Sequence, residues 1–400
     1  MSGAEAAGGK LPAAGGNLPP GYRTPSERLA AVAAASHILN VTPAEAARLL
    51  GEWLKARGES GYRLAQILPR LWQRPVRAWA DTKELPASLR AALDAEWPLG
   101  RLAREVRRES QDGTVKYLWR LTDGQAVESV MIPEGSRRTL CISSQAGCPL
   151  ACAFCATGTM GLSRHLAAWE IASQVREMLL EPDGQKPTNV VFMGMGEPLL
   201  NWPNVDVALS VLNDREGLGI GARHITVSTV GILPGLQQLA KRPEQFRLAI
   251  SLHAPTSEVR RGIMPIEKKY HLKDVLRAAG QFKRRITFEY VLMDGVNDRN
   301  EDAAELAKLA KASGAMVNLL PLHPGGAGAL KRSPTRRMHG FRIALERKGV
   351  EAVVRRSRGL DIEAACGQLR IAAGDEVPAE PHRDVHEPRG VGLDPHAADA

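Results

Sequence analysis

Residues 139–180, TLCISSQAGCPLACAFCATGTMGLSRHLAAWEIASQVREMLL, contain a short β-rich run followed by a longer helical stretch. The run at 139–142 is apolar and β-branched, whereas apolar residues recur at helical spacing over 169–180. This alternation continues, with strands predicted at 189–193, 224–229, 246–252, 286–292, 316–320 and 352–354 and helices at 272–282 and 301–311. It predicts a parallel α/β sheet or barrel, in which functional residues gather at the carboxyl ends of the strands.

The regions flanking these repeats have other patterns. Residues 25–98 are helical in pattern, and Thr42, Pro43 and Glu45 are typical of a helix start. Turn signals at 112–113 and 123–124 predict antiparallel strands. The Gly-, Ala- and Pro-rich ends predict disorder. We therefore divide the chain into a disordered tail (1–22), a helical accessory domain (23–98), a β-rich connector (99–135), an α/β domain (136–375) and a second disordered tail (376–400).

The composition is that of an ordinary globular protein. Of 400 residues, 44% are hydrophobic and 24% are charged, which excludes collagen-like, mucin-like and wholly disordered classes. The apolar run at 29–35 is far shorter than the ~18 residues of a membrane span, and we expect no secretory signal and a cytoplasmic location. The net charge of +9 suits a nucleic-acid partner, although many soluble proteins are mildly basic without one.

Four of the five cysteines lie in the stretch 141–155, CISSQAGCPLACAFC. Cys148, Cys152 and Cys155 have the spacing C-x3-C-x2-C, which favours an iron–sulfur cluster over a disulfide framework. Three thiolates on a four-iron cluster leave one iron without a protein ligand, and that iron is available for chemistry. The alternatives are a structural zinc site with Cys141 as the fourth ligand, or buried reduced thiols.

The cysteine spacing, with Phe154 before the last cysteine, resembles the radical SAM signature. Further stretches are similar to the RlmN/Cfr family of RNA adenine methyltransferases within that superfamily: ATGTMG (156–161), FMGMGEPLL (192–200), ITVSTVG (225–231), LAISLHAP (248–255), IMP (263–265), TFEYVLMDGVN (287–297), VNLLP (317–321) and RRSRGLDIEAACGQ (355–368). The resemblance extends from about residue 42 to 371. It implies a partial (β/α)6 radical SAM barrel with an RNA-binding helical domain at its N-terminal side.

The same resemblance implies two cofactors. Cys148, Cys152 and Cys155 would hold a [4Fe–4S] cluster, and S-adenosylmethionine would bind its open iron. The implied cofactor-binding residues are Gly196, Glu197, Ser228, Ser251, Leu252, His253 and Asn318. Glycines after a buried strand let a ligand approach the backbone, and a carboxylate there can pair with the amino group of the cofactor's methionine moiety. Taken alone, the glycine-rich segment would instead be a strand-end turn, and the other residues would be satisfied loop groups.

Three further residues have catalytic roles implied by the resemblance. Cys366 would be the methyl carrier: one S-adenosylmethionine methylates its thiolate, and a second supplies the radical that activates the S-methyl group for addition to adenine. Glu128 would be the proton acceptor, and Cys141 would form a transient disulfide with Cys366 to release the product. Without the resemblance, Glu128 would be an exposed strand carboxylate and Cys366 a buried, inert thiol.

We therefore expect a methyltransferase acting on C2 of adenine in 23S rRNA, and on tRNA as in dual-specificity members. The alternatives are C8 methylation of the same rRNA adenine, which confers antibiotic resistance, and a zinc-stabilised RNA-binding protein without catalysis. We also expect a low-potential electron donor such as flavodoxin, no membrane contact and a monomeric state.

The segment 331–358 has ten Lys or Arg residues and two acids, which predicts phosphate contacts or, alternatively, a solvated helix face. Two positions depart from the family pattern, with His323 where Asn is usual and Leu360 where an acid is common. Both lie near the expected substrate side.

Overall fold

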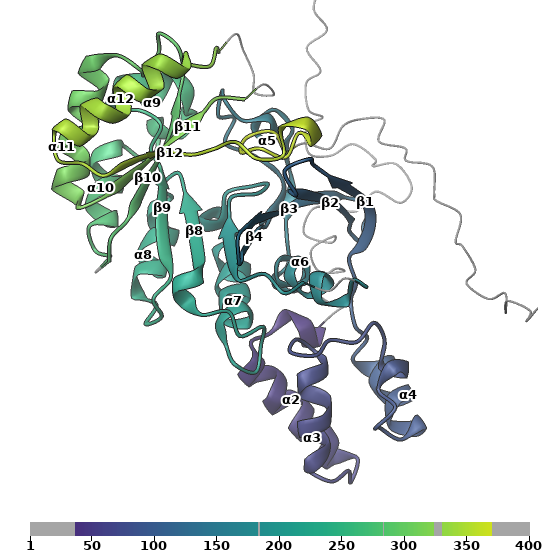
Figure 1. The fold of residues 1–400 in the computed structure, drawn as a ribbon. Helices are drawn as coiled ribbons and strands as arrows, with labels where there is room; N and C mark the ends of the chain where they lie inside the picture. Colours follow the sequence, from purple (N-terminus) through teal and green to yellow (C-terminus); the bar gives the residue numbers. More distant parts are fainter. Residues whose placement is uncertain (1–36, 183–184, 283, 324–329, 370–400) are drawn as a thin grey trace, which may run out of the picture.

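The computed structural model describes residues 37–182, 185–282, 284–323 and 330–369 (Figure 1). The tails predicted at 1–22 and 376–400 lie outside the described residues, as does the start of the helical pattern before residue 37. Within the described ranges, no helix is both long and apolar enough to cross a membrane.

A ten-stranded sheet with the order β1-β2-β3-β4-β7-β8-β9-β10-β11-β12 forms the centre of the protein (Figure 1). From β4 onward, neighbouring strands in this order are parallel: β4 (Arg137–Cys141), β7 (Asn189–Phe192), β8 (Ile225–Thr229), β9 (Arg247–Ser251), β10 (Thr287–Leu292), β11 (Met316–Pro321) and β12 (Ala352–Val354). Every predicted strand is present within two residues of its expected ends, because each is a short apolar run buried by helices. The α/β class is therefore confirmed.

Helices connect these strands and cover the sheet: α6 (Ala168–Leu180), α7 (Trp202–Asn213), α8 (Leu233–Lys241), α9 (Ser257–Ile263), α10 (Leu272–Ala279), α11 (Asn300–Ser313) and α12 (Thr335–Arg347). The prediction for α10 was three residues too long. Gly280 is the C-cap residue of α10, and its amide donates to Leu276 O at 3.0 Å. Glycine at this position favours the end of a helix.

Three antiparallel strands extend the sheet beyond β4: β1 (Ala103–Glu109), β2 (Val115–Arg120) and β3 (Ala126–Glu134). Their turns contain Gly113 and Gly124 with φ of 80° and 83°, a conformation that glycine adopts without strain. The predicted antiparallel strands are therefore present, and they belong to the same sheet as the parallel strands.

The N-terminal helices are α2 (Pro43–Ala56), α3 (Tyr62–Ile67) and α4 (Ala87–Glu96), which lie at one end of the molecule (Figure 1). The predicted start of α2 is confirmed, because Thr42 Oγ1 accepts from the amide of Glu45 at 3.3 Å. The fully buried Arg176 of α6 joins this region to the sheet by donating to the carbonyls of Leu71 and Val76.

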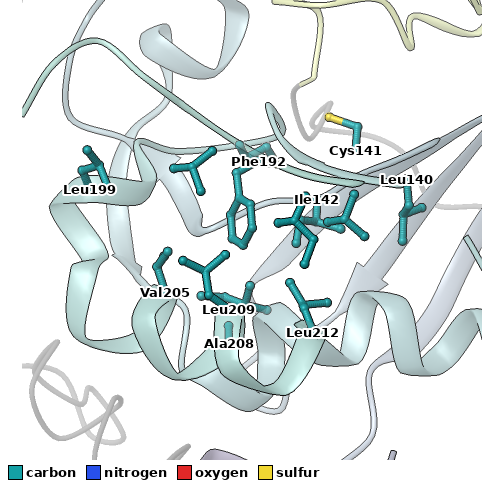
Figure 2. Packing of buried hydrophobic residues seen from close by; sticks show 14 of the residues in the cluster. Leu140, Cys141, Ile142, Phe192, Leu199, Val205, Ala208, Leu209 and Leu212 are labelled. Carbon is teal, nitrogen blue, oxygen red and sulfur yellow. The ribbon is translucent and has the colours of Figure 1, made fainter. Parts of the chain in front are cut away.

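Side chains alternate between the two faces of the sheet at β4. Figure 2 shows Leu140, Ile142 and Phe192 packed against Leu209 of α7, with the sulfur of Cys141 directed away from this cluster. The thiol of Cys141 therefore lies on the face of the sheet opposite α7.

The segment after β12 crosses back from that edge of the sheet to the β1–β2 turn (Figure 1). There Ser110 Oγ donates to Asp361 Oδ1 at 2.5 Å, and the Gly359 amide donates to Asp112 Oδ2 at 3.0 Å. Cys366 lies on this segment, so the chain brings it close to strands more than 200 positions earlier.

Candidate active site

The cysteine motif lies on a two-stranded hairpin of β5 (Gln145–Cys148) and β6 (Gly161–His165), with the short helix α5 (Ala156–Thr159) between them. Cys148 ends β5 and Cys155 directly precedes α5. The hairpin requires a glycine at position 147, because an added Cβ would lie 2.0 Å from Gly161 O. The sequence therefore forms a tight loop that holds the three cysteines close together.

The three thiols fit a metal cluster rather than a single ion. Cys148 and Cys152 are buried, and burial raises the pKa of Cys148 to about 12 and that of Cys152 further, with the neighbouring thiols acting in the same direction. Deprotonating Cys148 and Cys152 therefore needs a strong positive partner, which the irons of a [4Fe–4S] cluster provide.

The zinc alternative would need a different arrangement of ligands from the cluster. A structural zinc needs four ligands around one ion. Among the described residues, which include Cys141 and the three motif cysteines, no three His, Cys, Asp or Glu side chains converge on the position of one ion. In a four-iron cluster each thiolate binds a different iron, so the sulfurs need not converge on one point.

The Cys366 segment is anchored beside the cysteine loop. The amide of Ala156 donates to Gly367 O at 2.7 Å, and Thr157 Oγ1 donates to Leu369 O at 2.6 Å. Both donors are on α5, immediately after Cys155. The structure therefore places the expected methyl carrier against the loop expected to hold the cluster.

Cys366 also shares one site with Cys141. The Cys366 side chain is open to solvent, yet the surrounding protein raises the pKa of its thiol, first by desolvation and then through the carboxylate of Glu289. Electrostatic interactions reach from Cys366 to Cys141 and to Cys155, and burial together with Cys366 raises the pKa of Cys141. Without the family resemblance, the sequence predicts that Cys366 is buried, and that alternative is wrong.

Glu128 lies on β3 and faces the same side of the sheet as Cys141. Cys141 is paired with Val130 across the β3–β4 ladder, and residues two apart on a strand share a face. The Glu128 carboxylate is buried and forms an ion pair of 3.0 Å with Lys116. The alternative of an exposed strand carboxylate is therefore wrong.

The expected S-adenosylmethionine residues of the sheet lie on neighbouring strands, with Ser228 and Ser251 near the carboxyl ends of β8 and β9 and Asn318 in the middle of β11. Ser251, Glu289 and Asn318 are in register across β9, β10 and β11, and Asn318 Nδ2 donates to Glu289 Oε1 at 2.9 Å. Ser228 of β8 places its Oγ 3.4 Å from that of Ser251. The sheet thus gathers polar groups from four strands into one row.

His253 and Leu252 join this row to the cysteine loop. The His253 ring makes an edge contact with Phe154 at 4.5 Å between centroids, and its Nδ1 accepts from the Val291 amide at 3.1 Å. Burial lowers the pKa of His253 to about 3, so the ring is neutral and carries its proton on Nε2. Leu252 is buried and donates its amide to Glu289 O at 3.0 Å.

Glu197 orders the turn after β7. Its carboxylate accepts from the amides of Leu199 and Val230 and from Thr229 Oγ1, while burial raises its pKa to about 7. A carboxylate has about four acceptor positions, so these donors leave about one for a ligand.

The structure shows a packing reason for the glycine at position 196. An added Cβ would lie 2.5 Å from Gln145 Cβ, and φ is +97°. Packing against β5 therefore requires a glycine at this position. Its expected contact with the cofactor stays a prediction.

Sequence reasoning missed two buried charged residues in the site, Glu289 and Lys116. Each is a single charge inside an apolar strand, TFEYVL or VKYLW, and that signal was available. Burial raises the pKa of Glu289 to about 6.

Some basic side chains of the segment 331–358 form ion pairs, whereas the others are exposed. Three of its arginines pair with acids: Arg337 with Asp294 and Asp298, Arg342 with Glu346, and Arg358 with Asp112. The remaining Lys and Arg residues of the segment are exposed: Lys331, Arg332, Arg336, Arg347, Lys348, Arg355 and Arg356. Phosphate contact by these side chains stays a prediction.

The two departures from the family pattern have different surroundings. His323 is buried, with its Nε2 2.8 Å from Ser357 Oγ, whereas Leu360 is exposed.

Comparison with known proteins identifies the class first. Residues 142–307 match the Radical SAM superfamily, which implies a [4Fe–4S] cluster and S-adenosylmethionine. The crystal structure of a radical SAM methyltransferase from Sphaerobacter thermophilus is 41% identical, covers 83% of this chain and 98% of its own, and superposes with a TM-score of 0.77. The fold is therefore that of a radical SAM methyltransferase.

Curated relatives narrow the class to a family. A protein of Gemmatimonas aurantiaca named "Probable dual-specificity RNA methyltransferase RlmN" is 56% identical, over 87% of this chain and 98% of its own length. The "Dual-specificity RNA methyltransferase RlmN" of Anaeromyxobacter dehalogenans is 43% identical, over 84% of this chain and 92% of its own. The chain belongs to the RlmN family of RNA methyltransferases, and the resemblance in the sequence is confirmed.

Proposed function

We propose that this protein is a radical SAM enzyme that methylates C2 of adenine in 23S rRNA and in tRNA. The names of its relatives support an RNA substrate and this regiochemistry. The observation that carries the proposal is the anchoring of the Cys366 segment on α5, beside the cysteine loop. A methyl-carrying thiol must lie close to the cofactors that load and activate it.

The residues that would hold the cofactors follow from the site. Cys148, Cys152 and Cys155 would bind the cluster. S-adenosylmethionine would lie along the polar row on β8–β11 and beside Gly196 and Glu197, with the protonated Nε2 of His253 available as a donor. When bound, these groups supply the methyl group and a carbon-centred radical.

The chain's own side chains then perform three tasks. Cys366 carries the methyl group as a thioether. Glu128 accepts the proton that leaves the modified carbon of the base. Cys141, as its thiolate, attacks the sulfur of Cys366 and forms an S–S bond. The bond from that sulfur to the transferred carbon breaks, its electron pair goes to the adenine-bound carbon, and this carbon takes up a proton to become the methyl group of the released product. The electrostatic interaction between the two thiols, and the common face of the sheet that Glu128 and Cys141 share, support these roles.

The remaining expectations belong to the same proposal. We infer an RNA-binding role for the helical domain at 23–98, a connector at 99–135 and a catalytic domain at 136–375. A low-potential donor such as flavodoxin supplies the electron, and the protein is a cytoplasmic monomer. The exposed basic side chains of 331–358 contact RNA phosphates.

The decisive experiment is mass spectrometry of nucleosides from RNA treated with the anaerobically reconstituted enzyme. Both 23S rRNA fragments and tRNA serve as substrates. We expect 2-methyladenosine from each. The appearance of 8-methyladenosine would establish the C8 alternative, and a colourless, iron-free protein without methylated product would overturn the enzyme proposal.

A further inference from the structure

One buried lysine lies in the site without an assigned role. Lys116 of β2 is 7% exposed, and its Nζ lies 3.0 Å from Glu128 Oε1, whose residue is 3% exposed. Lysine is rarely buried to this degree, since removing an ammonium from water is costly unless a partner compensates. Glu128 is such a partner.

The strand register fixes where this lysine points. Lys116 is paired with Val130 across β2 and β3, and Val130 is paired with Cys141 across β3 and β4. Paired residues of a sheet share a face, and Glu128 is two positions from Val130. Lys116, Glu128 and Cys141 therefore project from the same side of the sheet.

Lys116 also contacts the segment that carries Cys366. Its Nζ donates to Glu363 O at 3.4 Å, three residues before Cys366. The same hairpin holds this segment through Ser110 and the Gln111 amide, which both donate to Asp361. One ammonium group thus touches both the expected proton acceptor and the methyl-carrying segment.

We propose that Lys116 is a positioning residue, which holds the Glu128 carboxylate charged and aimed at the base while fixing its distance from the Cys366 segment. The inference rests on the proposed function, in which Glu128 accepts a proton. In that step the C–H bond of the base breaks, the electron pair stays with the ring carbon and the proton binds a Glu128 oxygen. Lys116 touches no reacting atom.

Two physical effects support this role. An ammonium within about 4–6 Å favours the ionised form of a carboxylate, and only that form accepts a proton. A lysine has three donors, so it contacts the carboxylate and the Glu363 carbonyl at the same time. An apolar residue at 116 would remove both contacts, the ion pair with Glu128 and the hydrogen bond to the Glu363 carbonyl.

The test compares Lys116→Met with the wild-type holoenzyme. We expect kcat for 2-methyladenosine to fall on the order of 10²-fold, the lower range for loss of general base catalysis, with KM for RNA changed less than about twofold. A covalent protein–RNA adduct should accumulate on denaturing gels, because the proton-removal step slows. Wild-type kcat, or a loss confined to KM, would overturn the inference.

Companion variants separate positioning from folding. Lys116→Arg keeps the charge and should restore part of kcat. In a Glu128→Gln background, Lys116→Met leaves no unpaired buried charge and should cause no further loss. A further loss as large as that in the wild type would contradict the proposed coupling. This pair of measurements answers the question even if Lys116→Met alone folds poorly.

Two controls complete the design. Lys308→Met removes an exposed lysine paired with Glu305 on α11, and it should leave kcat unchanged. Asp361→Asn weakens the hold on the Cys366 segment without touching Glu128. If it produced the same adduct as Lys116→Met, segment docking would replace carboxylate positioning as the explanation.

The outcome also distinguishes this inference from the proposed function. A wild-type enzyme without methylated product, or a fully active Glu128→Gln, would remove the basis of both. An active wild type, an impaired Glu128→Gln and an unaffected Lys116→Met would refute the inference alone.

Discussion

The two halves of the site are assembled in different ways. The cysteine loop is a contiguous stretch, with all three motif cysteines on one hairpin. The other half, comprising Lys116, Glu128, Cys141 and Cys366, comes from three strands and from a segment that returns from the far edge of the sheet. A local motif therefore provides one half, whereas the order and register of the strands provide the other. A substitution in one half should therefore impair that half without disturbing the other.

The largest expected effect concerns the contiguous half. Cys148→Ala removes one cluster ligand, so we expect loss of bound iron, of the visible iron–sulfur absorption and of all methylation. Iron analysis and absorption spectra measure this.

Cys366→Ala is the matched control from the other half, and it should abolish methylation while retaining the cluster. Loss of iron in Cys366→Ala would show that the two halves are not independent, and methylated product from this variant would refute its role as the carrier.

A smaller effect is expected within the distant half. Cys141→Ala leaves the cluster and the carrier in place but removes the thiol that attacks Cys366. The reaction should stop within the first turnover, with RNA covalently attached to the protein. Denaturing electrophoresis and mass spectrometry detect this adduct, and continued turnover without an adduct would argue against Cys141 as the resolving thiol.

The packing of Gly196, after β7, against Gln145 of β5 can be tested by measuring the free energy of unfolding. Gly196→Ala places a Cβ 2.5 Å from Gln145 Cβ at a φ of +97°, so we expect a loss of about 2–4 kcal/mol in the free energy of unfolding. Gly262→Ala is the matched control, because nothing lies within 4 Å of its added Cβ. Denaturant titration compares the two, and an equal loss in both would exclude the clash as the cause.

The smallest expected effect is a pH dependence from Glu197. Burial raises its pKa from an ordinary 4.5 to about 7, so the folded state binds this proton more tightly than the unfolded state. Its stabilising contribution is complete below about pH 4.5 and is lost as pH rises through 7, by about 1–3 kcal/mol. Urea titrations at pH 5 and pH 7.5 give the change in the free energy of unfolding between these pH values. We expect this change to be smaller for Glu197→Gln than for the wild type, and an equal change in both would contradict the raised pKa.

Sequence predicted the parts that depend on neighbouring residues. The strands from β4 to β12 were located because each is a short apolar run, and the cysteine loop was located by its spacing. The partner of Lys116, the register of Glu289 with Asn318 and the Ser110–Asp361 bond depend on sheet order, which no local pattern contains. The packing of Gly196 against Gln145 was not predicted, because Gln145 is its neighbour in space but lies on another strand.

The segment around Cys366 is tethered at both ends. Asp361 is bound to the β1–β2 turn and Gly367 to the helix after Cys155, so only residues 362–366 lie between the two attachments. Five residues reach at most about 17 Å when fully stretched, and a span pinned at both ends moves much less. Cys366 can therefore move only a short distance between these two attachment points. A larger movement requires the segment to break its hydrogen bonds to α5, the helix that follows the cluster ligand Cys155.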